Sequence, residues 1–125
     1  MSPPLRVERN PRSGAVLLED GSKGGAERLL TGDLTWEVQD TGVRCVAAPC
    51  PTFRGTRIET GKAHPEEVLH EVDFSRANLS ERELARAQTQ LKNGLRVEGR
   101  VRWVPNRGPA GAARILEVRR LLTAR

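Results

Sequence analysis

The segment LRVEGRVRW at residues 95–103 decides the fold, because it reads as one long strand with two chemically different faces. Its odd-numbered positions, from Leu95 to Trp103, are apolar or glycine, and its even-numbered positions are charged. This two-residue period is typical of a half-buried β-strand. After a loop at 105–112, a last strand is predicted over 114–122, with a bulge near residues 119–120 that restores the phase of its apolar residues.

These two strands are expected to pair as a hairpin. In that pairing Glu98 faces Arg119, and Arg100 faces Glu117. Opposite charges across a strand pair stabilise the sheet by roughly 0.2–1 kcal/mol each. Part of the basic strand face is therefore predicted to be paired within the sheet.

A helix is predicted directly before the hairpin, over about 80–92. Ser80 and Glu83 make a capping box, in which each side chain accepts from a backbone N–H that the first helical turn leaves free. Leu79 and Leu84 flank this start as a hydrophobic staple, and Gly94 is a typical stop.

Earlier strands are predicted from shorter alternating runs, at residues 34–39, 43–46, 55–59 and 68–74, with a proline-bound loop at 47–53. The protein is therefore expected to be mainly β with one helix. Five of the six predicted runs, in the order β-β-β-α-β-β, favour a small five-stranded antiparallel barrel of OB type with Trp36 and Trp103 as its large core residues. The alternative is an open antiparallel sheet with one covering helix.

The composition indicates one domain. The chain has 125 residues, and 37% of them are apolar, which suffices for one modest core. We expect a loose tail at residues 1–13 and a single β-rich domain over 14–125, with its core at about 33–122. No apolar run approaches the roughly 20 residues that span a bilayer, and the start shows no apolar signal-peptide core. Whether a leader has been removed stays open.

The two cysteines, Cys45 and Cys50, enclose four residues, and prolines precede and follow the second one. A bent loop of this length can bring two Cα atoms within the roughly 4.4–6.8 Å that a disulfide needs. We favour a disulfide, which predicts an extracytoplasmic location, in the periplasm or at the cell surface. Two free thiols are one alternative and would be compatible with a cytoplasmic protein.

Zinc is the other alternative for the cysteines. Cys45, Cys50, His64 and His70 have the spacing Cys-x4-Cys-x13-His-x5-His, which lies close to the range of tetrahedral zinc sites. Prolines crowd these residues, and His70 falls in a predicted strand instead of on a helix with His64. We therefore expect no metal ion and no cofactor.

The segment around the cysteines resembles a small uncharacterised bacterial domain family with the pattern G-x-R-C-x-x-x-P-C-P-[ST]-[WYF]. Further likeness in 70–73, in the helix and in 97–100 extends the resemblance over about 33–122. It implies an exported or lipoprotein-like protein with no established activity, and it supplies no catalytic residue. The matching positions are Gly42, Arg44, Cys45, Pro49, Cys50, Pro51, Thr52 and Phe53.

The function predicted from the sequence is a non-enzymatic binding or structural module that displays the cysteine loop to an unknown protein or small ligand. No nucleophile-elbow, metalloprotease or phosphate-loop motif occurs, so no enzyme is expected. A protease inhibitor with Phe53 or Arg54 in a specificity pocket is an alternative. The sequence does not identify the ligand or the oligomeric state. The predicted contact residues are Pro49, Pro51, Phe53 and Arg54.

A nucleic-acid-binding module of OB type is the second alternative. The net charge of +5 permits such a role without demanding it, and Arg96, Arg100 and Arg102 would form the basic face. Binding of single strands also uses exposed aromatic side chains for stacking, and only 3% of the residues are aromatic. Nucleic acid is therefore a possible partner but not the favoured one.

Overall fold

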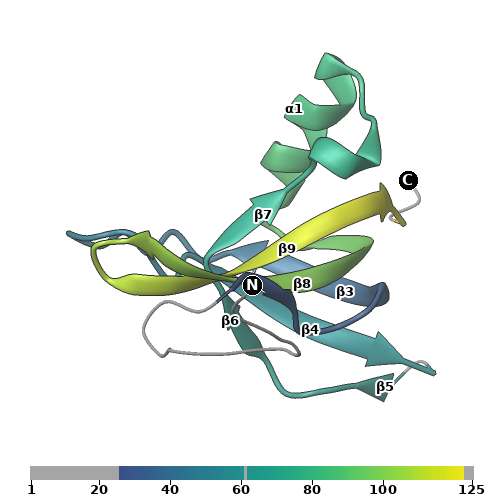
Figure 1. The fold of residues 1–125 in the computed structure, drawn as a ribbon. Helices are drawn as coiled ribbons and strands as arrows, with labels where there is room; N and C mark the ends of the chain where they lie inside the picture. Colours follow the sequence, from purple (N-terminus) through teal and green to yellow (C-terminus); the bar gives the residue numbers. More distant parts are fainter. Residues whose placement is uncertain (1–25, 61, 123–125) are drawn as a thin grey trace, which may run out of the picture.

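The computed structural model describes residues 26–60 and 62–122, so the expected tail at 1–13 lies outside the described residues. Figure 1 shows a twisted sheet with the helix standing above one end of it. In chain order the elements are β2 (Arg28–Leu29), β3 (Leu34–Asp40), β4 (Phe53–Glu59), β5 (Lys62–Ala63), β6 (Glu67–Leu69), β7 (Glu71–Asp73), the short 3-10 helix η2 (Ser75–Ala77), α1 (Glu81–Gln90), β8 (Leu95–Gly108) and β9 (Gly111–Leu121).

The described strands form one open sheet. Its strand order is β5-β4-β3-β8-β9-β7, with β2 beside β8 and β6 beside β4. All pairs are antiparallel except β7 with β9, which is parallel. The open sheet with one helix is therefore confirmed, and the closed OB-type barrel is wrong. Closure would require the two ends of the sheet to pair, but these ends are the very short strands β5 and β7, which do not pair with each other.

The β8–β9 hairpin is longer than its sequence predicts. The two strands run to Gly108 and from Gly111, so most of the predicted loop at 105–112 is strand. The ladder is irregular between Val104 and Gly108, where Pro105 has no N–H to donate and Asn106 takes a φ of 53°. The expected bulge in β9 is confirmed, because the register passes from Val118 directly to Arg120.

The core lies on one face of the central strands. Trp36 and Val38 of β3 pack with apolar residues of β8 and β9, and Leu69, Ala87 and Leu91 complete the cluster. The Trp36 side chain is fully buried, and its indole N–H donates to the Gly99 carbonyl at 3.2 Å. The prediction that Trp103 is a large core residue is wrong. The alternation of buried residues in β8 changes phase after Val101, so Trp103 lies half-buried beneath the Arg28 guanidinium, 4.4 Å from its ring centroid.

The helix begins as its sequence predicts. Ser80 is the N-cap, and both hydrogen bonds of its capping box with Glu83 are present. Only Ala87 is buried along α1, and Leu91 is buried at its C-terminal end. The helix therefore covers a small part of the sheet and stands off the rest (Figure 1).

Two earlier strand predictions need correction. Residues 43–46 are not a strand, because they belong to a loop and make no strand pairing. The predicted strand at 68–74 is two short strands separated by His70, since β6 pairs with β4 whereas β7 pairs with β9. The strand predictions at 34–39 and 55–59 are confirmed.

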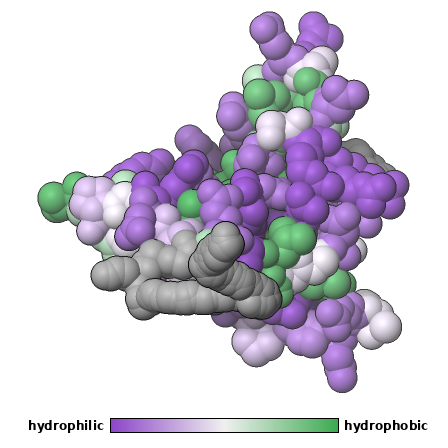
Figure 2. Space-filling view, in the orientation of Figure 1, coloured by the Kyte–Doolittle hydropathy of each residue, from purple (hydrophilic) through white to green (hydrophobic). Residues whose placement is uncertain are grey.

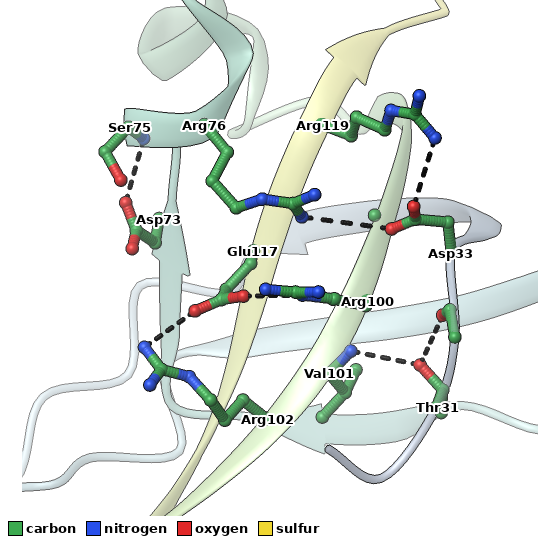
Figure 3. Close-up of polar contacts among 12 residues, drawn as sticks. Thr31, Asp33, Asp73, Ser75, Arg76, Arg100, Val101, Arg102, Glu117 and Arg119 are labelled. Carbon is green, nitrogen blue, oxygen red and sulfur yellow. Dashed lines mark hydrogen bonds and ion pairs between the residues drawn. The ribbon is translucent and has the colours of Figure 1, made fainter. Parts of the chain in front are cut away.

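The polar face of the hairpin is held by ion pairs. The Glu117 carboxylate is buried and contacts Arg100 at 2.8 Å and Arg102 at 2.6 Å (Figure 3). The predicted Arg100–Glu117 pair is therefore confirmed. Glu98 contacts Arg120 at 2.7 Å instead of Arg119, because the bulge passes over Arg119, which contacts Asp33 at 3.2 Å.

His70 joins β6 to β9 through two backbone-directed hydrogen bonds. The backbone N–H of His70 donates to the Arg114 carbonyl, and the ring Nδ1 of His70 accepts from the backbone N–H of Arg114, both at 2.9 Å. Burial, followed by the positive charge of Arg114, holds the pKa of His70 below its ordinary value. Both causes favour the neutral ring, which is the form that accepts a hydrogen bond at Nδ1.

The Glu117→Ala variant is expected to lower the free energy of unfolding by about 2–3 kcal/mol, because it leaves two guanidinium groups over the hairpin without their buried carboxylate. Both guanidinium-bearing side chains are 32% exposed, so water offsets part of the loss. Urea unfolding measures the effect. Glu98→Ala is the matched control and should cost less than about 1 kcal/mol, because its partner Arg120 is 66% exposed. Equal losses in the two variants would contradict this account.

Stability is expected to fall between about pH 8 and pH 5 in part through His70. Its folded pKa is lowered from 6.5, so the unfolded chain binds the extra proton first. The contribution of His70 to stability is therefore complete well above its unfolded pKa of 6.5, and it is lost as the pH falls through the pKa of the folded state. Urea midpoints across this range should vary less in His70→Asn, whose amide oxygen still accepts from the Arg114 N–H. His64→Asn, which removes an exposed ring, is the control and should retain the loss at low pH.

Candidate functional site: the disulfide-closed loop

The loop at residues 41–52 connects β3 to β4 and extends beyond the end of the sheet (Figure 1). Its base is closed by Thr41, whose N–H and hydroxyl each donate to the Thr52 carbonyl at 2.8 Å. The Asp40 carboxylate accepts from the N–H of Gly42, which takes a φ of 81° that favours glycine. The chain thus leaves β3 through a fixed turn.

A disulfide joins Cys45 and Cys50 within this loop. Their Cα atoms are 5.5 Å apart, so the predicted bridge is confirmed. The Thr52 hydroxyl donates to the Val43 carbonyl at 3.1 Å on the same side of the base. The loop is therefore closed by one covalent link and several hydrogen bonds.

The turn of the β8–β9 hairpin supports the loop from outside. The Ala110 N–H donates to the Ala48 carbonyl at 2.8 Å, and Pro49 is buried beside this contact point in the chain. A Cβ atom at Gly108 would lie 2.4 Å from the same carbonyl, so only glycine permits this approach. No local sequence signal joins residue 48 to residues 108–110, and the sequence analysis missed this support.

The outer part of the loop is apolar and exposed. Val46 is fully exposed, at 107% of its reference surface, and Val43 is 41% exposed. Figure 2 shows hydrophobic side chains at the end of the molecule where the loop and the hairpin turn meet in Figure 1. Large apolar side chains in such positions are candidates for contact with a partner.

The predicted contact residues divide into two groups. Pro51 is exposed on the loop, but Pro49 is buried. Phe53 and Arg54 belong to β4 instead of the loop. Phe53 packs against the core, and Arg54 contacts Glu66 at 3.0 Å.

The three arginines of the predicted basic face are all paired with carboxylates. Arg96 contacts Glu37 at 2.8 Å, and Arg100 and Arg102 share Glu117. These contacts confirm the prediction that carboxylates within the sheet pair with arginines of this face.

The four candidate zinc ligands are not brought together. Both cysteine sulfurs are used in the disulfide. The His64 ring contacts Glu59 at 3.3 Å, and His70 contacts the Arg114 backbone. Within residues 26–60 and 62–122, no group of three or more histidine, cysteine or acidic side chains could hold a metal ion.

A shallow hollow of about 440 Å³ lies over the polar side of β3 and β4, and the sequence analysis did not identify it. Thr56 and Ile58 contribute to its lining, together with two ion pairs, Arg54–Glu66 and Arg96–Glu37. Polar alternation in β3 and β4 could have suggested this surface, but its concave shape depends on the twist of the sheet.

Comparison with known proteins adds a family. The model of a Domain of unknown function (DUF6748) matches residues 8–120. The chain belongs to this family. The expected membership of an uncharacterised domain family is therefore confirmed, and the match covers all of β2 to α1, all of β8 and nearly all of β9. No curated protein and no solved structure matches the chain.

Among the described residues of this family member, no helix has the length and apolar character required to cross a membrane.

Replacing both cysteines by alanine is expected to lower the free energy of unfolding by about 2 kcal/mol, the contribution of closing a loop of this size. The core contains neither sulfur, so the double variant should still fold cooperatively with a buried Trp36. Urea unfolding followed by tryptophan fluorescence measures both properties, and the reduced wild-type chain should match the variant. Loss of cooperative unfolding would show that the core depends on the bridge.

Proposed function

We propose that this chain is a non-catalytic binding module whose contact surface is the outer part of the disulfide-closed loop, centred on Val46. The observation that carries the proposal is a fully exposed valine between two cysteines that are joined by a disulfide. Its side chain contributes little to the described core, because it belongs neither to the buried cluster around Trp36 nor to a second, small cluster of Val104, Ala113 and Ile115. Binding to a partner would remove this apolar surface from water, a contribution of about 2 kcal/mol for one valine.

Preorganisation supports the same surface. The bridge between Cys45 and Cys50, the base at Thr41 and Thr52, and the contact of Ala48 with the hairpin turn all fix the backbone around Val46. A loop that is ordered before binding loses less conformational entropy in the complex. A bridge that only stabilised the sheet would not require an exposed apolar residue between its cysteines.

The two alternatives receive less support. Nucleic-acid binding would use Arg96, Arg100 and Arg102, which already contact carboxylates. A substrate-like inhibitor loop would present Phe53 or Arg54, but these residues lie in β4, where Phe53 packs against the core.

The disulfide also supports a compartment. Such bridges persist in oxidising environments and are rare in the reducing cytosol. We therefore place the module outside the cytoplasm as part of this proposal, in line with the exported character that the sequence resemblance implies. Intact mass of the chain isolated from its own cells, with and without reduction, would establish whether the bridge forms there.

Random peptides displayed on phage test the proposed surface. Peptides selected on the immobilised full chain are expected to bind at the loop, because preorganised apolar surfaces supply the strongest contacts. Val46→Asp should then weaken most of the selected peptides by at least about tenfold, measured by biolayer interferometry. Its urea midpoint should match that of the wild type, since the residue is exposed.

Ala85→Asp, on the exposed side of α1, is the matched control and should leave the affinities unchanged. Selected peptides that bind Val46→Asp as tightly as the wild type would refute the proposal, because their contact surface would lie elsewhere on the chain.

A further inference from the structure

We infer that the loop and the β8–β9 turn form one contact surface, and that it fits a protein partner with an apolar pocket rimmed by carboxylates. The inference rests on the proposed function and extends it to a second segment and to the chemistry of the partner. We name this surface the composite tip. It consists of Val43, Val46, Ala48, Pro109 and Ala110.

The two segments are joined at close range. The hydrogen bond from the Ala110 N–H to the Ala48 carbonyl is 2.8 Å long, and the backbone of Gly108 approaches the same carbonyl so closely that a Cβ atom has no room. Figure 1 shows the hairpin turn and the loop side by side at one end of the sheet. A partner that covers Val46 would therefore also meet the turn.

All five residues of the composite tip are exposed, and all are apolar. Val46 is the more exposed of the two valines, and the alanines and Pro109 have shorter side chains. Short side chains allow the wall of a pocket to approach closely while Val46 enters it. They also lose little rotamer freedom on binding, since alanine and proline have almost none.

The charge beside the composite tip indicates the rim of the pocket. Arg44 is the only charged residue in the loop at 41–52. The Arg44 side chain is 70% exposed. Its guanidinium donates to the Val43 carbonyl, and its contact with the Asp40 carboxylate is long, at 3.9 Å. A carboxylate on the partner would complement this guanidinium and steer association, whereas a basic rim would oppose it.

A protein pocket fits these features better than a bilayer surface. Insertion into a membrane relies on a large apolar face, commonly with tryptophan, phenylalanine or leucine, and on several basic residues together. The composite tip offers only valine, alanine and proline, with Arg44 beside it. One fully exposed valine, Val46, beside the charge of Arg44 is suited to one pocket with one acidic group.

Two synthetic pools of 12-residue peptides provide the probe. Both combine leucine and phenylalanine with charged residues, which are aspartate and glutamate in the acidic pool and lysine and arginine in the basic pool. Fluorescence anisotropy with the full chain should show the acidic pool binding at least about tenfold more tightly. Val46→Asp and Ala110→Asp should each weaken this binding by a similar factor, and Arg44→Glu should reverse the preference between pools.

Ala85→Asp introduces the same charge on α1 and should change neither affinity. If Val46→Asp weakens binding of the acidic pool but Ala110→Asp does not, the hairpin turn is not part of the contact surface. That result would overturn the composite tip as one surface and leave the proposed function standing. Tighter binding of the basic pool, or no binding of either pool, would overturn the acidic rim. Binding to phosphatidylglycerol vesicles that Val46→Asp abolishes would assign the surface to membranes and overturn the protein partner.

Discussion

The pairing of β8 with β9 on one side and with β3 on the other is the interaction on which the structure depends. It places Val97 and Val101 of β8 in one buried cluster with Trp36 of β3 and with Leu116 and Val118 of β9. Because β8 continues past the core, the same strand also carries the hairpin turn that supports the loop. One strand thus connects the stability of the fold to the position of its exposed end.

The polar side of this hairpin explains why a basic protein need not bind nucleic acid. Each arginine on that side meets a carboxylate, and Glu117 holds two of them from a buried position. A phosphate would have to displace these internal partners, with the cost of leaving Glu117 buried and unpaired. By contrast, the loop at 41–52 presents apolar surface whose nearest charge, Arg44, has only a long contact with Asp40. The chemistry of the two surfaces therefore differs more than the net charge suggests.

Features that depend on neighbours in sequence were predictable. The alternation in β3 and β8, the capping box at Ser80 and the spacing of Cys45 and Cys50 each identified a structure that is present. Features that depend on distant segments were not. Pro105 and Asn106 indicated a loop, yet both lie within β8, and whether the sheet closes depends on the pairing of its edges. Within the candidate site, the bridge was predictable, whereas the contact of Ala48 with Ala110 joins residues far apart in the chain.

The register between β3 and β8 has a consequence for how the chain reaches its native state. Trp36 pairs with Val97, so this half of the sheet forms only after some sixty residues have been brought together, whereas β9 follows β8 after a turn of two residues. The entropic cost of closing a chain segment rises with its length, and sheets whose paired strands are far apart in the sequence form slowly. We therefore expect a hairpin of β8 and β9 to form early, as a template onto which β3 docks later with its indole ring. The loop that follows β3 then acquires its support at Ala110 only when that docking is complete.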